Sequence, residues 1–438
     1  MKRFIKTRIF KVLIAIIVTL AFLCAIAIYI NPYRSTTSWN SMENTLPINE
    51  KLTVEEAHAE LKYLITLIKD RHFSAVNSLP EKVLSQYNEE TQNMPEHPTV
   101  LDVWQSGSRI LKQLDDAHSA MYYYCDDKKL LNIDFKLSGG ELICSSSSRK
   151  GQRLVKINDI EVKDLYKRFL SQFSYENIYY AEHNFPKYLR RSSGLNWLGV
   201  ECYDKVQLTF SNNGAFESEY YSFEELKSDN IKPDFVRYIV DRDKSIGILT
   251  LDSCRYNDKY KNTLRDFFAD VKSNAIKYIA VDLRKNGGGN SAVANEFIKY
   301  LPVDSYMDFG GKVRLKYWAV GEEVSSTKNN KYEDLLFNGD VYVITSKSTF
   351  SSATWFAVLL RDNNLCKVIG EPSGNRPSAY GDVLTFQLPY SKLSFSLTYK
   401  QFSRPAVEKH NEPALIPDYL IDQEKAIEEL YRILSQYK

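Results

Sequence analysis

The stretch "TSKSTFSSATWFAVLLRDNN", residues 345–364, leads from a strand pattern to a helix pattern through two serines. Ser351 and Ser352 follow the apolar run "DVYVI" and precede "ATWFAVLL". A strand-to-helix corner can hold a nucleophilic hydroxyl rigidly in an exposed position. The same corner is also where an ordinary serine caps a helix. The local sequence therefore leaves both roles open for Ser351.

The segments around this corner alternate between strand and helix patterns from about residue 236. The predicted strands are 245–253, 276–284, 340–346 and 366–371, and the predicted helices are 263–273, 291–301 and 352–363. Strands that alternate with helices favour parallel pairing with helical crossovers. Residues 382–402 then have the pattern of a hairpin.

The first half of the chain has a different organisation. Residues 53–115 are predicted to be helical, starting at Thr53 with Glu56 three residues later, which is the pattern of a capping box. Residues 141–170 predict strand, loop, strand, turn and helix, whereas 187–213 show no clear period. The chain is thus expected to contain a helical part, a mixed part and a parallel α/β core.

Composition limits the classes of protein that need to be considered. The chain has 438 residues, of which 44% are hydrophobic, and this is typical of a globular protein with two or three domains. The net charge of +2 gives no indication of a nucleic-acid partner. The six cysteines show no zinc-binding spacing, so we interpret them mainly as small core residues and expect no metal.

The N-terminus has the pattern of a membrane anchor. Residues 12–30 are apolar and uncharged, which is long enough to span a bilayer, and residues 1–11 carry five basic side chains. The basic flank should remain cytoplasmic, which places the rest of the chain outside the cell membrane. A cleaved signal peptide is the alternative, but the run ends in "IYINP", a poor cleavage site. We therefore expect a single-pass protein that contacts the lipid bilayer through 12–30.

A glycine turn and a histidine also have functional and ordinary interpretations. The three glycines in "VDLRKNGGGNS" permit close backbone approach before a helix, and this could supply an oxyanion hole. The turn lacks the spacings of phosphate-binding loops. His118 lies beside Asp116 in "LDDAHSAMYY", and local sequence alone favours a capping or buried structural histidine. The loop 368–382, "VIGEPSGNRPSAYGD", has the composition of a surface turn.

Taken in order, His118, "DLRKNGGG", "TFSSATWFA", "VIGEPSGNRP" and "LIPDYLI" resemble the C-terminal processing (tail-specific) protease family. This family includes the tricorn core protease and the interphotoreceptor retinoid-binding protein domains. The resemblance covers residues 51–438 and implies an α/β fold with a Clp protease/crotonase-like core of ββα units. The N-terminal pattern predicts a basic tail (1–11), an anchor (12–30) and a linker (31–50). For the rest of the chain we expect a helical subdomain (51–119), a mixed region with a partial PDZ-like insert (120–235) and the protease core (236–438).

The resemblance implies a role for each motif. Ser351 falls on the nucleophile, which leaves Ser352 to cap the helix. The backbone N–H of Ser352 and that of a turn glycine, Gly287 or Gly288, would form the oxyanion hole.

His118 matches the general base of the tricorn-like branch. A glutamate near the C-terminus then orients the catalytic centre, and Glu408 and Glu412 both remain candidates. In another branch a lysine acts as the base, but Arg376 occupies its place here and cannot release its proton at useful pH. Arg376 could instead bind a substrate carboxylate.

These inferences lead to a membrane-anchored, outward-facing serine endopeptidase that acts on protein or peptide substrates without a cofactor. A catalytically inactive module that binds peptides or apolar ligands is the alternative, and the missing lysine favours it. A crotonase-like acyl-CoA enzyme ranks last, because an outward-facing domain would rarely meet coenzyme A.

Overall fold

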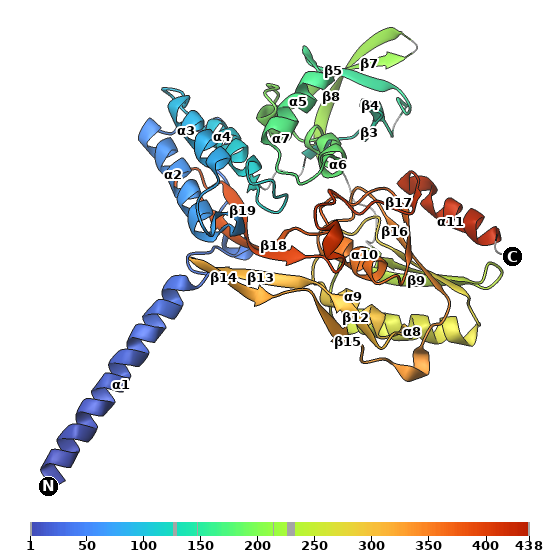
Figure 1. The fold of residues 1–438 in the computed structure, drawn as a ribbon. Coiled ribbons are helices and arrows are strands. Elements are labelled where there is room, and N and C mark those ends of the chain that lie inside the picture. The colour runs from blue at the N-terminus through green and yellow to red at the C-terminus, as the bar shows by residue number, and fades with distance from the viewer. Residues whose placement is uncertain (1, 126–128, 147, 213, 226–232, 437–438) are drawn as a thin grey trace.

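The computed structural model describes residues 2–125, 129–146, 148–212, 214–225 and 233–436. Helix α1 (Lys2–Ile30) projects from the rest of the molecule (Figure 1). Its segment Phe10–Ile30 has a mean hydropathy of 3.0 and is not buried, so it meets the length and composition of a membrane span. A signal sequence near the N-terminus would share these properties. The side chains of residues 1–9, which include most of the predicted basic flank, lie outside the described part.

Three helices follow α1, as predicted for residues 53–115. They are α2 (Val54–Arg71), α3 (Glu81–Gln92) and α4 (Val100–Lys112). The capping box predicted at Thr53 and Glu56 is present at the start of α2. Leu61, Leu64 and Ile68 recur at helical spacing and are fully buried, so they form the inner face of α2.

The mixed region forms a seven-stranded sheet in the order β2-β8-β7-β5-β4-β3, with β6 paired to β5. Its strands are β2 (Lys129–Leu131), β3 (Phe135–Ser138), β4 (Glu141–Cys144), β5 (Arg153–Ile157), β6 (Ile160–Glu161), β7 (Lys205–Asn212) and β8 (Ala215–Glu225). Three helices lie between β6 and β7, namely α5 (Val162–Gln172), α6 (Ile178–Tyr188) and α7 (Ser192–Trp197). The order predicted for 141–170 is confirmed.

The interpretation of residues 204–213 as lacking a period is wrong. β7 alternates strictly, because Val206, Leu208 and Phe210 are buried while the residues between them are more exposed.

The core contains a six-stranded sheet in the order β20-β17-β16-β11-β10-β9. The four predicted strands β10 (Ile246–Leu251), β11 (Tyr278–Asp282), β16 (Asp340–Thr345) and β17 (Lys367–Gly370) pair in parallel, which confirms the prediction. β9 (Val236–Asp241) adds an antiparallel edge, and β20 (Tyr419–Leu420) adds a parallel one.

Helices cover both faces of this sheet (Figure 1). One face packs against α8 (Asp258–Ser273), α9 (Ala292–Ile298) and α10 (Ser352–Asp362), and the other against α11 (Ala426–Ser435). Helix α8 starts five residues before the predicted 263, because the side chain of Asn257 accepts the N–H of Tyr260 and caps it there.

The predicted hairpin is confirmed as β18 (Tyr380–Gln387) and β19 (Ser394–Ser403). β19 also pairs with β1 (Met121–Tyr122) and with β13 (Gly310–Leu315), which pairs with β14 (Trp318–Glu322). The hairpin thereby extends from the core to the N-terminal helices (Figure 1), and it brings the segment before β1 close to the core.

The remaining elements are short. A two-stranded sheet contains β12 (Ser305–Asp308) and β15 (Ser325–Lys328). The 3-10 helices are η1 (Trp39–Ser41), η2 (Phe73–Ala75), η3 (Glu333–Leu335), η4 (Val407–Lys409) and η5 (Gln423–Lys425).

Candidate active site

Ser351 occupies a strained corner between β16 and α10. Its φ of 54° and ψ of −129° are unusual for a residue with a side chain and cost about 1–3 kcal/mol. The buried Asn375 holds this conformation, since its Oδ1 accepts the Ser351 N–H at 2.8 Å. Ser351 is the N-cap residue of α10, but its hydroxyl does not cap the helix. Within the described part of the chain its Oγ has no hydrogen-bond partner, so it is free to react.

The expectation that Ser352 caps the helix is wrong. Ser352 is the first residue of α10, and its Oγ donates to the carbonyl of Gly289 at 2.8 Å. The hydroxyl therefore ties the glycine turn to the start of α10.

The glycine turn lies directly against Ser351. Gly288 has a φ of 102°, and a Cβ placed on it would lie 2.7 Å from the Cβ of Ser351. Only glycine permits both this conformation and this contact. The Gly288 N–H donates to Oδ1 of Asn286 at 2.8 Å, whereas Gly287 is exposed with open space around it.

His118 lies in the loop between α4 and β1 and packs against the residue that precedes Ser351. Its ring centroid is 4.6 Å from that of Phe350, and its side chain is 11% exposed. Phe350 stacks on Tyr180 on its other side, with the centroids 4.5 Å apart. Both ring nitrogens of His118 are buried and lack a hydrogen-bond partner among the described residues. The fold thus brings His118 beside the serine corner without a hydrogen bond to Ser351.

Asp116 anchors the loop that carries His118. Its Oδ1 accepts the backbone N–H of His118 at 2.9 Å. Its Oδ2 accepts the hydroxyls of Ser119 at 2.5 Å and Thr398 at 2.7 Å and lies 3.1 Å from Nε2 of His72. Burial opposes the charged form, but the contacts with His118 and His72 hold the pKa of Asp116 well below its usual range.

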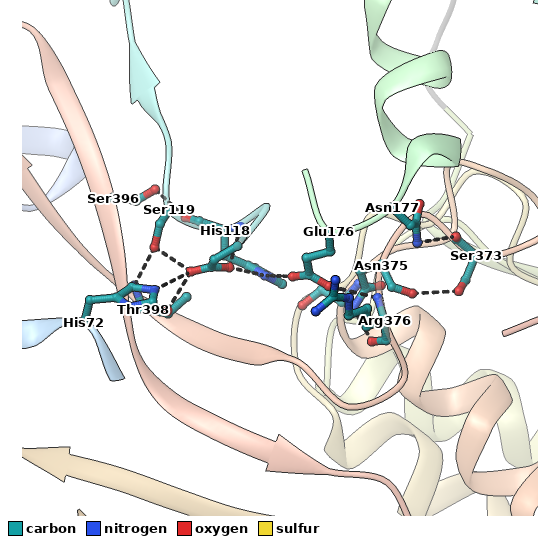
Figure 2. A network of polar contacts seen from close by, with 12 residues as sticks. His72, His118, Ser119, Glu176, Asn177, Ser373, Asn375, Arg376, Ser396 and Thr398 are labelled. Carbon is teal, nitrogen blue, oxygen red and sulfur yellow. Dashed lines mark hydrogen bonds and ion pairs between the residues drawn. The ribbon is translucent and has the colours of Figure 1, made fainter. Parts of the chain in front are cut away.

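Glu176 approaches His118 from the mixed region. Figure 2 shows the two side chains pointing toward one another, with Nδ1 of His118 3.7 Å from Oε1 of Glu176 and also 3.7 Å from Oδ1 of Asp116. Burial alone would lower the pKa of His118, but these two carboxylates raise it to about 9. Burial raises the pKa of Glu176, and His118 partly offsets that effect.

Sequence reasoning missed the buried groups around His118, namely His72, Glu176 and Asn375. Asp116 was recognised only as a neighbour of His118 in the chain. Its position two residues before His118 was the indication that the two side chains could interact. Asn375 lies within the quoted motif "VIGEPSGNRP", but nothing in that motif indicates its bond to Ser351. Glu176 lies in a segment whose local sequence gives no indication, because it meets His118 only through the fold.

The side chains of Glu408, Glu412 and Arg376 make no ion pair with His118 in the described structure. Glu408 is exposed on η4, and Glu412 Oε2 lies 2.6 Å from Nη1 of the buried Arg404. The side chain of Arg376 is exposed, while its backbone N–H donates to Oε2 of Glu176 at 2.8 Å. The carboxylates that face His118 in the described structure are thus Asp116 and Glu176.

Asp116, His118 and Glu176 also have the residue types of metal ligands, and their ligand atoms lie within 4.8 Å of one another. Asp116, however, already accepts four hydrogen bonds. The same two carboxylates favour the protonated form of His118 and raise its pKa to about 9, and a metal would have to displace that proton to bind the ring. The arrangement is better suited to holding a proton on His118 than to binding an ion.

Residues 245–421, which include Ser351 and the glycine turn, match peptidase family S41. This match covers less than half of the chain, and over it the chain is similar to that peptidase family. The predicted resemblance to C-terminal processing proteases is therefore confirmed, and it supports a serine-type peptidase. His118 and Glu176 lie outside the matched segment.

Solved structures share this fold. Mature CPAF complexed with lactacystin is 13% identical with a TM-score of 0.64, and the match covers 88% of this chain and 97% of that one. A second structure of mature CPAF has the same identity and TM-score, with coverage of 88% and 95%. The photosystem II D1 C-terminal processing protease is 13% identical with a TM-score of 0.48, covering 86% and 97%. No curated protein matches the sequence.

Proposed function

We propose that this protein is an endopeptidase that cleaves peptide bonds through an acyl-enzyme on Ser351, with His118 as the general base. The observation that carries the proposal is the strained backbone of Ser351, which packs closely against Gly288 at the start of α10. This is the arrangement of a nucleophile elbow, where strain exposes the hydroxyl to substrate.

In this mechanism His118 removes the proton of Ser351 Oγ as the oxygen attacks the scissile carbonyl. Protonated His118 then gives that proton to the leaving amine, and water releases the acyl group by the reverse sequence. No hydrogen bond joins the two side chains in the described structure, and catalytic hydrogen bonds often form only when substrate is bound.

The oxyanion would bind the backbone N–H of Ser352 together with that of a turn glycine. Loss of one such donor typically costs about 10²–10³ in rate. Gly287 and Gly288 are both candidates, and the Gly288 N–H would first have to leave Asn286 Oδ1.

We further propose an outward-facing enzyme anchored through α1, because Phe10–Ile30 is long, apolar and unburied. Its substrates would be proteins or peptides, and the exposed Arg376 could bind a substrate carboxylate. A Clp protease/crotonase-like core of ββα units and a PDZ-like insert in 120–235 belong to this proposal as well.

The second candidate is a module that binds peptides or apolar ligands without cleaving them. Arg376 in place of a lysine and the missing Ser351–His118 hydrogen bond are the observations that favour it.

A fluorophosphonate probe distinguishes the two functions. The full chain in detergent would be compared with Ser351→Ala, His118→Ala and the matched control Ser348→Ala, and the labelled peptide would be mapped. The proposal predicts a label on Ser351 that is lost with His118→Ala and retained in the control. A wild-type chain that neither takes the label nor hydrolyses an unfolded protein would favour the binding module.

A further inference from the structure

Glu176 is a buried carboxylate with one free oxygen. It lies between α5 and α6, and its side chain is 2% exposed. Its Oε2 accepts the backbone N–H of Arg376 at 2.8 Å, while its Oε1 has no hydrogen-bond partner in the described structure (Figure 2). A buried polar atom without a partner is costly, typically about 1–3 kcal/mol. Among the described residues, the contact with His118 offsets part of this cost without a hydrogen bond.

The free oxygen faces a second unpartnered atom. Nδ1 of His118 lies 3.7 Å away and is also buried without a hydrogen-bond partner. A shift of about 1 Å would bring the two atoms to hydrogen-bond distance and satisfy both of them. Glu176 is thus placed so that its free oxygen can accept a hydrogen bond from the ring of His118.

The core holds Glu176 in this position. The adjacent Asn177 donates from Nδ2 to the carbonyl of Pro413 at 2.9 Å and to that of Ser373 at 3.2 Å. Together with the Arg376 N–H, these bonds fix the segment against the same loop that supplies Asn375 to Ser351. One loop therefore orients both the nucleophile and the carboxylate that faces the base.

We propose that Glu176 is the positioning residue for His118, holding the Nδ1–H so that Nε2 is the nitrogen that takes the proton of Ser351. This inference rests on the proposed function of His118 as a base. Glu176 also stabilises the imidazolium that forms when the proton is transferred, as a buried carboxylate does in serine hydrolases. Asp116 has a different role, because its oxygens already accept the backbone N–H of His118 and contact the side chains of Ser119, Thr398 and His72.

The resemblance assigned this task to Glu408 or Glu412. Glu408 is exposed and Glu412 is engaged by Arg404, whereas Glu176 is buried and aimed at the ring. The mixed region, rather than the C-terminal segment, thus completes the site.

The test measures the pKa of His118 directly. The full chain, with ¹³C-labelled histidine, would be titrated by NMR in detergent, and the His118 signal would be assigned by its loss in His118→Ala. Glu176→Gln keeps the shape of the side chain and the acceptor for Arg376 but removes the charge. The matched control is Glu182→Gln, which removes another carboxylate that links α6 to the core, through Lys347 Nζ at 2.5 Å.

Glu176→Gln should lower the pKa of His118 by about 1–3 units, because an opposite charge a few ångströms away has been removed. Asp116 remains as the other charged group that faces the ring, and it prevents a full return to the ordinary value. The kcat should fall about 10²-fold with KM unchanged, and the ascending limb of the rate profile, which reports the deprotonation of His118, should move to lower pH. Glu182→Gln should change neither quantity.

An unchanged His118 pKa in Glu176→Gln would overturn the inference, whatever the activity. If that variant does not fold, Glu176→Asp, which keeps the charge but shortens its reach, should give a smaller shift in the same direction, and the absence of any shift would also overturn it. A wild-type chain without hydrolysis or probe labelling would instead contradict the proposed function, while the NMR titration still decides the position of Glu176.

Discussion

At the scale of the residue, the charge of His118 determines how the site should respond to pH. Asp116 and Glu176 raise its pKa to about 9, so the ring is protonated at neutral pH, whereas a general base must be neutral. We therefore expect kcat/KM on a peptide substrate to rise with pH until about 9. A rate profile that levels off near pH 6.5, the ordinary pKa of histidine, would contradict this expectation.

The stability that protonated His118 contributes is complete below about pH 6.5 and is lost as the pH rises through about 9.

Asp116 is the residue whose charge should matter most for stability. Its four donors all point at a carboxylate, so Asp116→Asn would bring an N–H against one of them. We expect a loss of about 3–5 kcal/mol in the free energy of unfolding, measured with urea at pH 7. The matched control Asp115→Asn removes a half-exposed ion pair with Lys82 and should cost at most about 1 kcal/mol. Because the pKa of Asp116 is lowered by folding, the difference between wild type and Asp116→Asn should shrink as the pH falls below 3.8.

At the scale of the element, the junction of the glycine turn with α10 sets the geometry of the nucleophile. Gly288→Ala should reduce the rate of fluorophosphonate labelling about 10²-fold or more, because its Cβ would displace Ser351. It should also destabilise the fold by about 1–3 kcal/mol, since alanine avoids a φ of 102°. Gly287→Ala meets no atom within 4 Å and should leave the melting temperature nearly unchanged. Equal melting temperatures for the two variants would show that the turn is not strained as described.

At the scale of the whole molecule, three parts of the chain supply the site. His118 comes from the loop after the N-terminal helices, Glu176 from the mixed region, and Ser351 with Asn375 from the core. α1 lies apart from this centre and touches the body near its end, where the Tyr29 and Tyr317 hydroxyls are 2.9 Å apart (Figure 1). Removal of α1, the proposed membrane anchor, should therefore leave the reactivity of Ser351 intact.

Deletion of residues 1–30 should move the protein from the membrane pellet to the soluble fraction and leave probe labelling of Ser351 within about twofold, because no site residue contacts the described side chains of residues 10–30. The full chain should resist extraction from membranes by carbonate and retain its N-terminus on sequencing. An N-terminus beyond residue 30 in the mature protein would instead show that the helix is a cleaved signal.

The sequence by itself determined the features that depend on neighbours along the chain. The four parallel strands, the capping box at Thr53 and the strand-to-helix corner at Ser351 each follow from a local pattern of apolar, capping and small residues. The tertiary structure alone decided which charges face His118, because Glu176 and Asp116 are separated from each other along the chain and meet only when the mixed region docks on the core loop at 373–376. Glu408 and Glu412 occupy the expected place in the order of motifs along the chain. Where each carboxylate lies in the folded protein is determined by its burial and, for Glu412, by its ion pair with Arg404. Periodicity reports which face of an element is buried, whereas the partner of a buried charge is set by contacts between distant segments, and these contacts leave no local pattern.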